Sequence, residues 1–176
     1  MAKKRKKSST LSLALSAGAV LFAIVAVCMM FVNAATVDVK LTEVNFTGAQ
    51  LAFGYKETIG SKDFEILSFS FMNLLPYLLA LGGGVVAVLA ALGKKSFLFN
   101  VIATACFVAA AIFFFTAITY ITVANTAGEG LLNQAWKSVV ESIRNSENVK
   151  LAIGSILGGV FSVIAAACSA LKIFVK

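Results

Sequence analysis

The sequence predicts an all-α membrane fold: a four-transmembrane-helix bundle with a small β-rich first extracellular loop and an amphipathic helix in the second. Hydrophobic residues make up 60% of the chain and charged residues 13%, with a mean hydropathy of +0.94. In soluble domains, about a quarter of residues are charged. The apolar residues gather into four stretches without Asp, Glu, Lys or Arg, at 11–32, 67–92, 97–123 and 151–171. At about 1.5 Å per helical residue, each stretch can cross a hydrocarbon core of about 30 Å.

These stretches divide the chain into nine segments. The expected spans are residues 11–34, 67–93, 97–124 and 151–173, and the expected outer loops are 35–66 and 125–150. Residues 1–10, 94–96 and 174–176 form the basic N-terminus, a turn and the C-terminus on the other side. The first stretch also resembles a secretory signal, because Val32-Asn33-Ala34 would suit a signal peptidase. Its apolar part, about 22 residues, exceeds the 7 to 15 typical of signal peptides, which favours a retained span.

The charges predict the orientation of the chain. The side with both termini and the 94–96 turn would carry nine Lys/Arg and no acid, and the other side six Lys/Arg and all eight Asp/Glu. The positive-inside rule therefore predicts a multi-pass cell-membrane protein with both termini cytoplasmic. The basic run fits this topological role, with an anionic-lipid anchor as the alternative and no nucleic acid as partner; it consists of Lys3, Lys4, Arg5, Lys6 and Lys7.

Strict alternation predicts short strands in the first outer loop. From Thr36 the apolar residues Val37, Val39 and Leu41 alternate with Asp38, Lys40 and Thr42. The pattern resumes at Val44 and Phe46 and, after Thr47-Gly48, in Leu51, Phe53 and Tyr55, with turns expected at Gly48, Gly54 and Gly60. Because a lone hairpin is marginal in water, we expect this sheet to rest on the helix ends or to pair with another protein.

In the second outer loop, apolar residues recur at helical spacing, which predicts an amphipathic helix. Its apolar face comprises Leu132, Ala135, Trp136, Val139, Val140 and Ile143. Trp136, the only tryptophan, is the expected anchor at the membrane interface. The helix has three possible uses: lying in the interface, packing on the sheet of the first loop, or docking a partner.

Small residues predict close helix packing in two spans. In the fourth span, Gly154, Gly158, Ser162 and Ala166 follow one another at a spacing of four, with a GxxxG match. This face would pack the helices of one chain together or mediate self-association. In the second span, Pro76 and the triplet Gly82-Gly83-Gly84 fit either a gating hinge or a packing adjustment.

The sequence offers little catalytic chemistry. It contains no His, no acid in any expected span, and no Walker, dinucleotide, zinc or nucleophile-elbow pattern. Cys28, Cys106 and Cys168 are intramembrane and far apart, so neither an outer disulfide nor a metal site is indicated. We therefore expect no enzyme, with no catalytic, cofactor-binding or metal-ligating residues and no cofactor.

The favoured function is that of a non-catalytic integral membrane protein: a scaffold, an accessory subunit or an envelope-organising component. Its expected partners are the lipid bilayer and either another protein or a second copy, bound through the fourth span or the outer loops. The alternative is a small transporter or channel subunit. That alternative predicts a continuous polar track through Asn73, Asn100, Thr104 and Thr116.

A first outer loop that reads as strands, a tight inner turn and a second outer loop with a helix together resemble the tetraspan layout of claudin-like proteins. The resemblance is architectural, because residues 36–66 contain neither the Trp nor the two Cys of the claudin signature. No claudin pore or adhesion role carries over to a residue here. The segment 46–55 is similar to loops of small uncharacterised bacterial four-helix membrane proteins.

Overall fold

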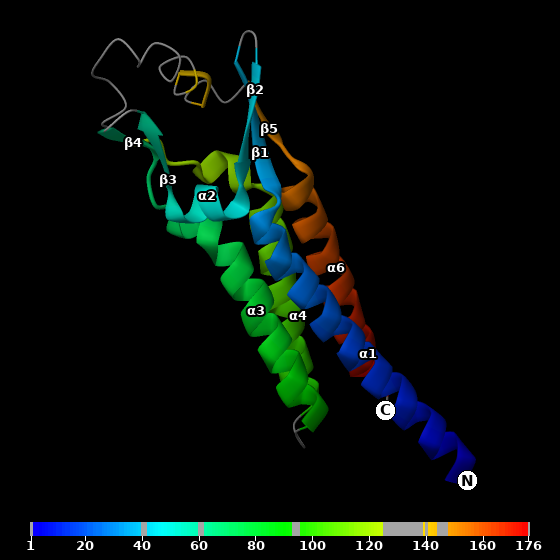
Figure 1. Cartoon of the computed structure of the whole chain (residues 1–176). Coiled ribbons are helices and arrows are strands. Elements are labelled where there is room, and N and C mark those ends of the chain that lie inside the picture. The colour runs from blue at the N-terminus through cyan, green and yellow to red at the C-terminus, as the bar shows by residue number, and fades with distance from the viewer. Residues whose placement is uncertain are drawn as a thin grey trace. The chain divides into compact units, whose positions relative to one another are not determined.

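The computed structural model describes residues 2–39, 42–59, 62–92, 96–124, 139, 141–143 and 148–175 (Figure 1). The chain forms two compact units. The helical unit comprises Met1–Cys28, Pro76–Ile112 and Gly158–Lys176. The sheet unit comprises Met29–Leu75 and Phe113–Leu157.

Four long helices account for the four apolar stretches. They are α1 (Ala2–Cys28), α3 (Phe71–Leu92), α4 (Ser96–Phe115) and α6 (Ile153–Phe174). The parts of the chain that are long and apolar enough to cross a membrane are Thr10–Phe31, Phe71–Leu92, Phe97–Phe115 and Ile153–Phe174. The prediction of four helices of membrane-spanning length, and hence of a multi-pass membrane protein, is confirmed at this level.

The interior of the helical unit is built from small side chains. Its buried cluster consists of six alanines and Phe107, and the alanines are Ala19, Ala23, Ala87, Ala103, Ala165 and Ala166. A Cβ atom at Gly83 would lie 2.8 Å from the Phe107 ring, and one at Gly84 would lie 3.1 Å from Cβ of Ala23. Glycine thus permits close helix contacts here, which supports the packing interpretation of this triplet over a hinge.

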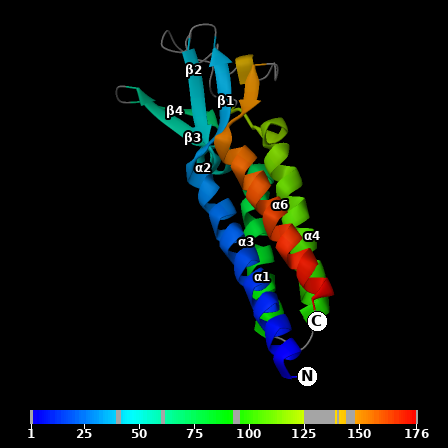
Figure 2. The same cartoon turned by 90° about the vertical axis from the view of Figure 1, so that its right-hand side faces the viewer.

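The outer faces of these helices are apolar. Leu21, Val85, Val108 and Val163 are each about half exposed, although a soluble protein would bury most such side chains. Figures 1 and 2 show α1, α3, α4 and α6 running side by side in the helical unit. An apolar surface around a bundle with a small-residue core is the arrangement expected of helices in lipid.

The sheet unit contains a small antiparallel sheet of order β2-β1-β5 (Figure 2). Its strands are β1 (Asn33–Val39), β2 (Thr42–Thr47) and β5 (Val149–Leu151), and Val37 pairs with Val44 on one side and Val149 on the other. Strands β3 (Tyr55–Ile59) and β4 (Lys62–Leu67) form a second antiparallel pair. The chain at 122–124 lies along β4, where the Ser68 amide donates to the Thr122 carbonyl.

The core of the sheet unit joins both predicted outer loops. Val37, Phe46, Leu51, Ile66 and Leu67 are buried together with Val139 and Ile143 of the second loop. Residues 139 and 141–143 are helical. The buried side chains of Val139 and Ile143 favour packing on the sheet over the other two roles considered for this segment, which were lying in the membrane interface and docking a partner. Trp136 lies outside the described residues.

Four element boundaries differ from those expected, and one of them is at the fourth span, where Leu151 belongs to β5 and α6 begins at Ile153. Strand β1 begins at Asn33, inside the range expected for the first span, because α1 ends at Cys28 and a 3-10 turn, η1 (Met29–Phe31), follows. Residues 67–70 precede α3 without helical structure, and Leu67 belongs to β4. Helix α4 ends at Phe115, and residues up to 124 form the 3-10 turn η2 (Ala117–Tyr120) and an extended segment. In each case, residues that are apolar enough for a span form backbone hydrogen bonds within the sheet unit instead of extending a helix.

A short helix, α2 (Gly48–Phe53), replaces the expected turn and strand. Thr47 and Gln50 form a capping box, in which each side chain accepts a hydrogen bond from the other residue's backbone amide. Leu51 and Ala52 of this helix are buried, whereas Phe53 is exposed. Gly54 follows with a φ of 90° and ends the helix, as its predicted role in a turn requires.

Candidate functional site

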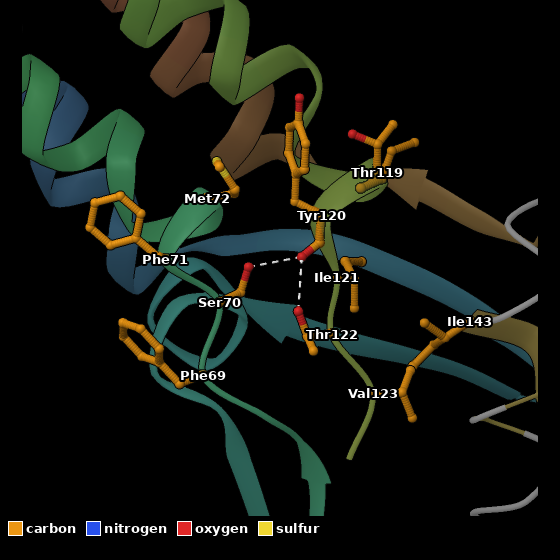
Figure 3. A pocket seen from close by; sticks show the side chains of 11 residues that line it. Phe69, Ser70, Phe71, Met72, Thr119, Tyr120, Ile121, Thr122, Val123 and Ile143 are labelled. Carbon is orange, nitrogen blue, oxygen red and sulfur yellow. Dashed lines mark hydrogen bonds between the residues drawn. The ribbon is translucent and has the colours of Figure 1, made fainter. Parts of the chain in front are cut away.

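A cavity of about 780 Å³ opens in the sheet unit (Figure 3). Two stretches far apart in sequence form its walls: 69–72, which leads into α3, and 118–123, which follows α4. The lining residues are Phe69, Ser70, Phe71, Met72, Ile118, Thr119, Tyr120, Ile121, Thr122, Val123 and Ile143. We call this cavity the sheet-unit pocket.

The two walls are joined through one backbone carbonyl, that of Tyr120. It accepts hydrogen bonds from Ser70 Oγ at 2.8 Å, from Asn73 Nδ2 at 3.1 Å and, more weakly, from Thr122 Oγ1 at 3.4 Å. Figure 3 shows the Ser70 and Thr122 hydroxyls converging on this oxygen. Because η2 ends at Tyr120, its carbonyl has no partner further along a helix, and side chains satisfy it instead. Ser70 and Asn73 are buried, so these bonds hold the walls together away from solvent.

The rim of the sheet-unit pocket is apolar and exposed. Phe69 and Phe71 are both more than half exposed, and Met72 is 45% exposed. The Tyr120 ring lies 6.0 Å from the Phe113 ring and forms the other side of the rim. Exposed aromatic and methionine side chains are typical both of surfaces that bind other molecules and of the ends of spanning helices, and Phe71 and Met72 begin the candidate span Phe71–Leu92.

Hydroxyl groups of the pocket donate to the backbone. The Ser70 and Thr122 hydroxyls donate to a carbonyl, so neither is paired with a base. The chain has no His, and among the described residues no group of three or more Cys, Asp or Glu could hold a metal ion. None of the described residues that line the pocket carries a carboxylate, an imidazole or a thiol.

The small residues singled out in the fourth span are all buried in α6, but their surroundings differ. A Cβ atom at Gly154 would lie 2.7 Å from the Asn33 carbonyl oxygen and 2.9 Å from that of Val32. The close contact at Gly154 is thus with the backbone that enters β1, not with a helix. Gly158 and Ser162 lie in the helical unit, where Ser162 Oγ donates to the Gly158 carbonyl at 2.8 Å, and Ala166 belongs to the alanine cluster.

The residues of the predicted polar track do not share one unit. Asn73 and Thr116 belong to the sheet unit, and Asn100 and Thr104 to the helical unit. The Thr104 hydroxyl donates to the Asn100 carbonyl of its own helix, and the Asn73 amide donates to Tyr120. A transport pathway through these residues stays a prediction.

Sequence reasoning missed the sheet-unit pocket, because both of its walls lie in stretches apolar enough to be assigned to spans. The available signal was the hydroxyl residues at the ends of those stretches. Ser68 and Ser70 precede α3, and Thr116, Thr119 and Thr122 follow α4. Such residues commonly satisfy backbone groups where helices begin and end.

Comparisons with known proteins add no relative. No protein-family model, no curated protein and no solved structure matches the chain. The four helices of spanning length are consistent with a tetraspan layout.

Proposed function

We propose that this chain is a non-catalytic protein of the cell membrane, an accessory subunit, scaffold or envelope-organising component that docks a partner protein at the sheet-unit pocket. The observation that carries the proposal is a 780 Å³ cavity with an exposed apolar rim, in which the hydroxyls of Ser70, Thr119 and Thr122 already bond within the chain. In the proposed topology, the termini are cytoplasmic and the sheet unit lies outside.

The rim of the sheet-unit pocket favours an apolar occupant. The lining is polar and apolar in about equal parts, and Phe69, Phe71 and Met72 supply its apolar side chains at the rim. The hydroxyl protons of Ser70 and Thr122 are already used on the Tyr120 carbonyl. An aromatic or aliphatic side chain from a partner would gain buried contact, as in the central pockets of protein interfaces.

Photo-crosslinking in native membranes tests the docking proposal. A photoreactive residue at Met72 should give a discrete protein adduct, and one at Val108, which is similarly exposed in the helical unit, should not. Introducing Phe71→Ser should remove the Met72 adduct while the protein still accumulates in the membrane. Two differently tagged copies of the chain show whether the adduct contains a second copy or another protein. The same adduct at both positions, or adducts with lipid alone, would contradict the proposal.

The distribution of charge supports the proposed topology. The helical unit contains nine Lys/Arg and no Asp or Glu, whereas the sheet unit contains all eight acids. Reporters active on only one side of the membrane, attached after Thr10, Lys95, Asn145 and Lys176, should report in, in, out and in. A C-terminal reporter that faces outward would exclude this topology, and release of an N-terminal reporter would indicate cleavage of the first span.

A further inference from the structure

A lysine lies on the buried face of the last helix. In α6, burial follows one stripe through the helical unit, formed by Ser162, Ala165, Ala166, Ser169 and Lys172. Lys172 is 6% exposed and Ser169 is 2% exposed. The neighbouring Leu171 is 57% exposed, so the helix places its apolar side chain outward and its charged one inward at this level. This arrangement is the reverse of the usual one at the end of a spanning helix, where lysine extends to the aqueous boundary.

The polar atoms at this end of the stripe are unsatisfied. Within the part of the chain that the structure describes, neither Lys172 Nζ nor Ser169 Oγ has a hydrogen-bond partner. Ser162 shows the contrast on the same stripe, because its hydroxyl donates to the Gly158 carbonyl. Ser169 and Lys172 are three residues apart, so their side chains lie on adjacent turns of one face. An ammonium and a hydroxyl placed together offer hydrogen-bond donors and one positive charge.

The helical unit has no carboxylate side chain that could neutralise this charge. Its sequence contains no Asp or Glu in any of its three segments, and eight further Lys/Arg. An unpaired ammonium removed from water is strongly disfavoured, so a buried lysine normally has an anionic partner. No Asp or Glu side chain of the helical unit can therefore be that partner.

The position of Lys172 along the helix indicates which anion is available. Lys172 follows Ile153, the first residue of α6, by 19 residues, which is about 28 Å of helix. In a helix that crosses a hydrocarbon core of about 30 Å, this places the ammonium near the headgroup region. Helix α1 lies beside α6 one turn earlier, because a Cβ atom at Gly18 would be 3.5 Å from Sγ of Cys168. Basic positions between spanning helices at this depth are known binding sites for lipid phosphates.

We propose that Lys172 and Ser169 bind a phosphate group, supplied by the headgroup of an anionic phospholipid. Because both atoms have almost no accessible surface in this structure, binding requires the Lys172 side chain to turn outward. Its ammonium then pairs with a phosphate oxygen, and the Ser169 hydroxyl donates a second hydrogen bond to the same group. The lipid thus neutralises the one lysine that α6 buries among its packed helices. This site is independent of the sheet-unit pocket, because all of its residues belong to the helical unit.

The test uses the full chain, purified in mild detergent and stripped of lipid. Thermal stability and native mass spectrometry follow the addition of phosphatidylglycerol, phosphatidylcholine or inorganic phosphate. We expect phosphatidylglycerol to stabilise the wild type and Lys172→Met to weaken its binding by about tenfold or more, beyond the roughly fivefold of a loose surface charge. Lys56→Met is the matched control, because it removes one positive charge from an exposed strand position.

Three further measurements separate the site from a general effect of charge or folding. Lys172→Arg should retain phosphatidylglycerol binding, and Ser169→Ala should weaken it less than Lys172→Met does. Without lipid, Lys172→Met should be at least as stable as the wild type, because it removes an unpaired buried charge. Inorganic phosphate that stabilises in the same Lys172-dependent way supports the site and identifies a soluble source. Equal stabilisation of Lys172→Met and wild type by phosphatidylglycerol, or equal effects of the two lipids on the wild type, would overturn the proposal.

Discussion

The two units bury apolar residues of different size. The cluster in the helical unit is six alanines around Phe107, whereas the core of the sheet unit relies on larger side chains such as Phe46, Leu51 and Ile66. Between helices in lipid there is no hydrophobic driving force, so small residues stabilise by allowing close backbone contact. In water, burial of large apolar groups is itself favourable. The small-residue core is what lipid around the helical unit would favour, and the large-residue core is what water around the sheet unit would favour.

The largest predicted effect contrasts the buried phenylalanines of the two units. Phe46 is 1% exposed, and its ring lies 5.9 Å from the Tyr55 ring in an edge-to-face arrangement. Phe46→Ala should cost about 3 to 5 kcal/mol, because the transfer free energy of the ring is lost and a cavity is left in its place. Phe107→Ala should cost less, because lipid replaces water as the environment of the unpacked side chain. Unfolding in detergent measures the loss of stability in both variants. Equal losses would show that the two cores do not differ in how burial of a large side chain stabilises them.

The second prediction concerns Gly154, where the sheet unit has no room for a side chain. A Cβ atom there would lie within 3 Å of two backbone carbonyl oxygens, those of Val32 and Asn33. Backbone at the start of β1 cannot move without disturbing its pairing with β2, so Gly154→Ala should cost about 1 to 3 kcal/mol. Hydrogen exchange should show the loss of protection in β1 and β5. An unchanged melting temperature would show that this backbone adapts freely.

The third prediction concerns two adjacent glycines of the helical unit, which differ in the room that they leave for a side chain. A Cβ atom at Gly83 would lie 2.8 Å from the buried Phe107 ring, whereas one at Gly82 meets nothing within 4 Å. Gly83→Ala should therefore destabilise by about 1 to 2 kcal/mol through overpacking. Gly82→Ala should be neutral or stabilise by up to about 1 kcal/mol, because alanine favours the helix. If both substitutions change the stability equally, the glycine triplet is not required for close packing at Gly83.

The sequence predicted the helical unit better than the sheet unit, for a physical reason. A charge-free run of about twenty residues has one low-energy form in lipid, so the helix that contains Gly82 and Gly83 could be located from composition alone. The runs could not reveal their own ends, because the stretch from Ala117 to Val123 carries no charge and fits a membrane span as well as a segment packed in water. There, hydrogen bonds to Tyr120 and Thr122 from residues about fifty positions away determine the backbone path.

The sheet-unit pocket could not be predicted, because it depends on that same pairing of distant segments. Alternation did predict strands around Val37 and Phe46, where one face of each strand is buried. The alternation of Leu51, Phe53 and Tyr55 predicts a strand, whereas Thr47 and Gln50 form a capping box that begins helix α2. A local capping signal here outweighs a short periodic pattern.

The smallest predicted effect lies on the surface of the sheet unit. Lys150 of β5 and Asp38 of β1 form an ion pair with a distance of 2.6 Å, and the Lys150 side chain is 68% exposed. The hydrogen bond and the charge of Asp38 raise the pKa of Lys150 above its ordinary value of 10.5. Exposed pairs contribute little to folding because water and salt screen them.

Because the pKa of Lys150 is raised in the folded chain, its protonated form favours folding. This contribution is fully present from neutral pH up to about 10.5 and is lost as the pH rises through the raised pKa. Asp38→Asn should therefore lower the melting temperature slightly at pH 8, and less above pH 11. The difference should also shrink in about 1 M salt, where the screening length is about 3 Å. In a Lys150→Met background, Asp38→Asn should have almost no effect. An undiminished loss of melting temperature in that background would mean that Asp38 acts through its backbone neighbours in β1 and not through Lys150. The pair would then not illustrate the difference between a screened surface charge and a packed core.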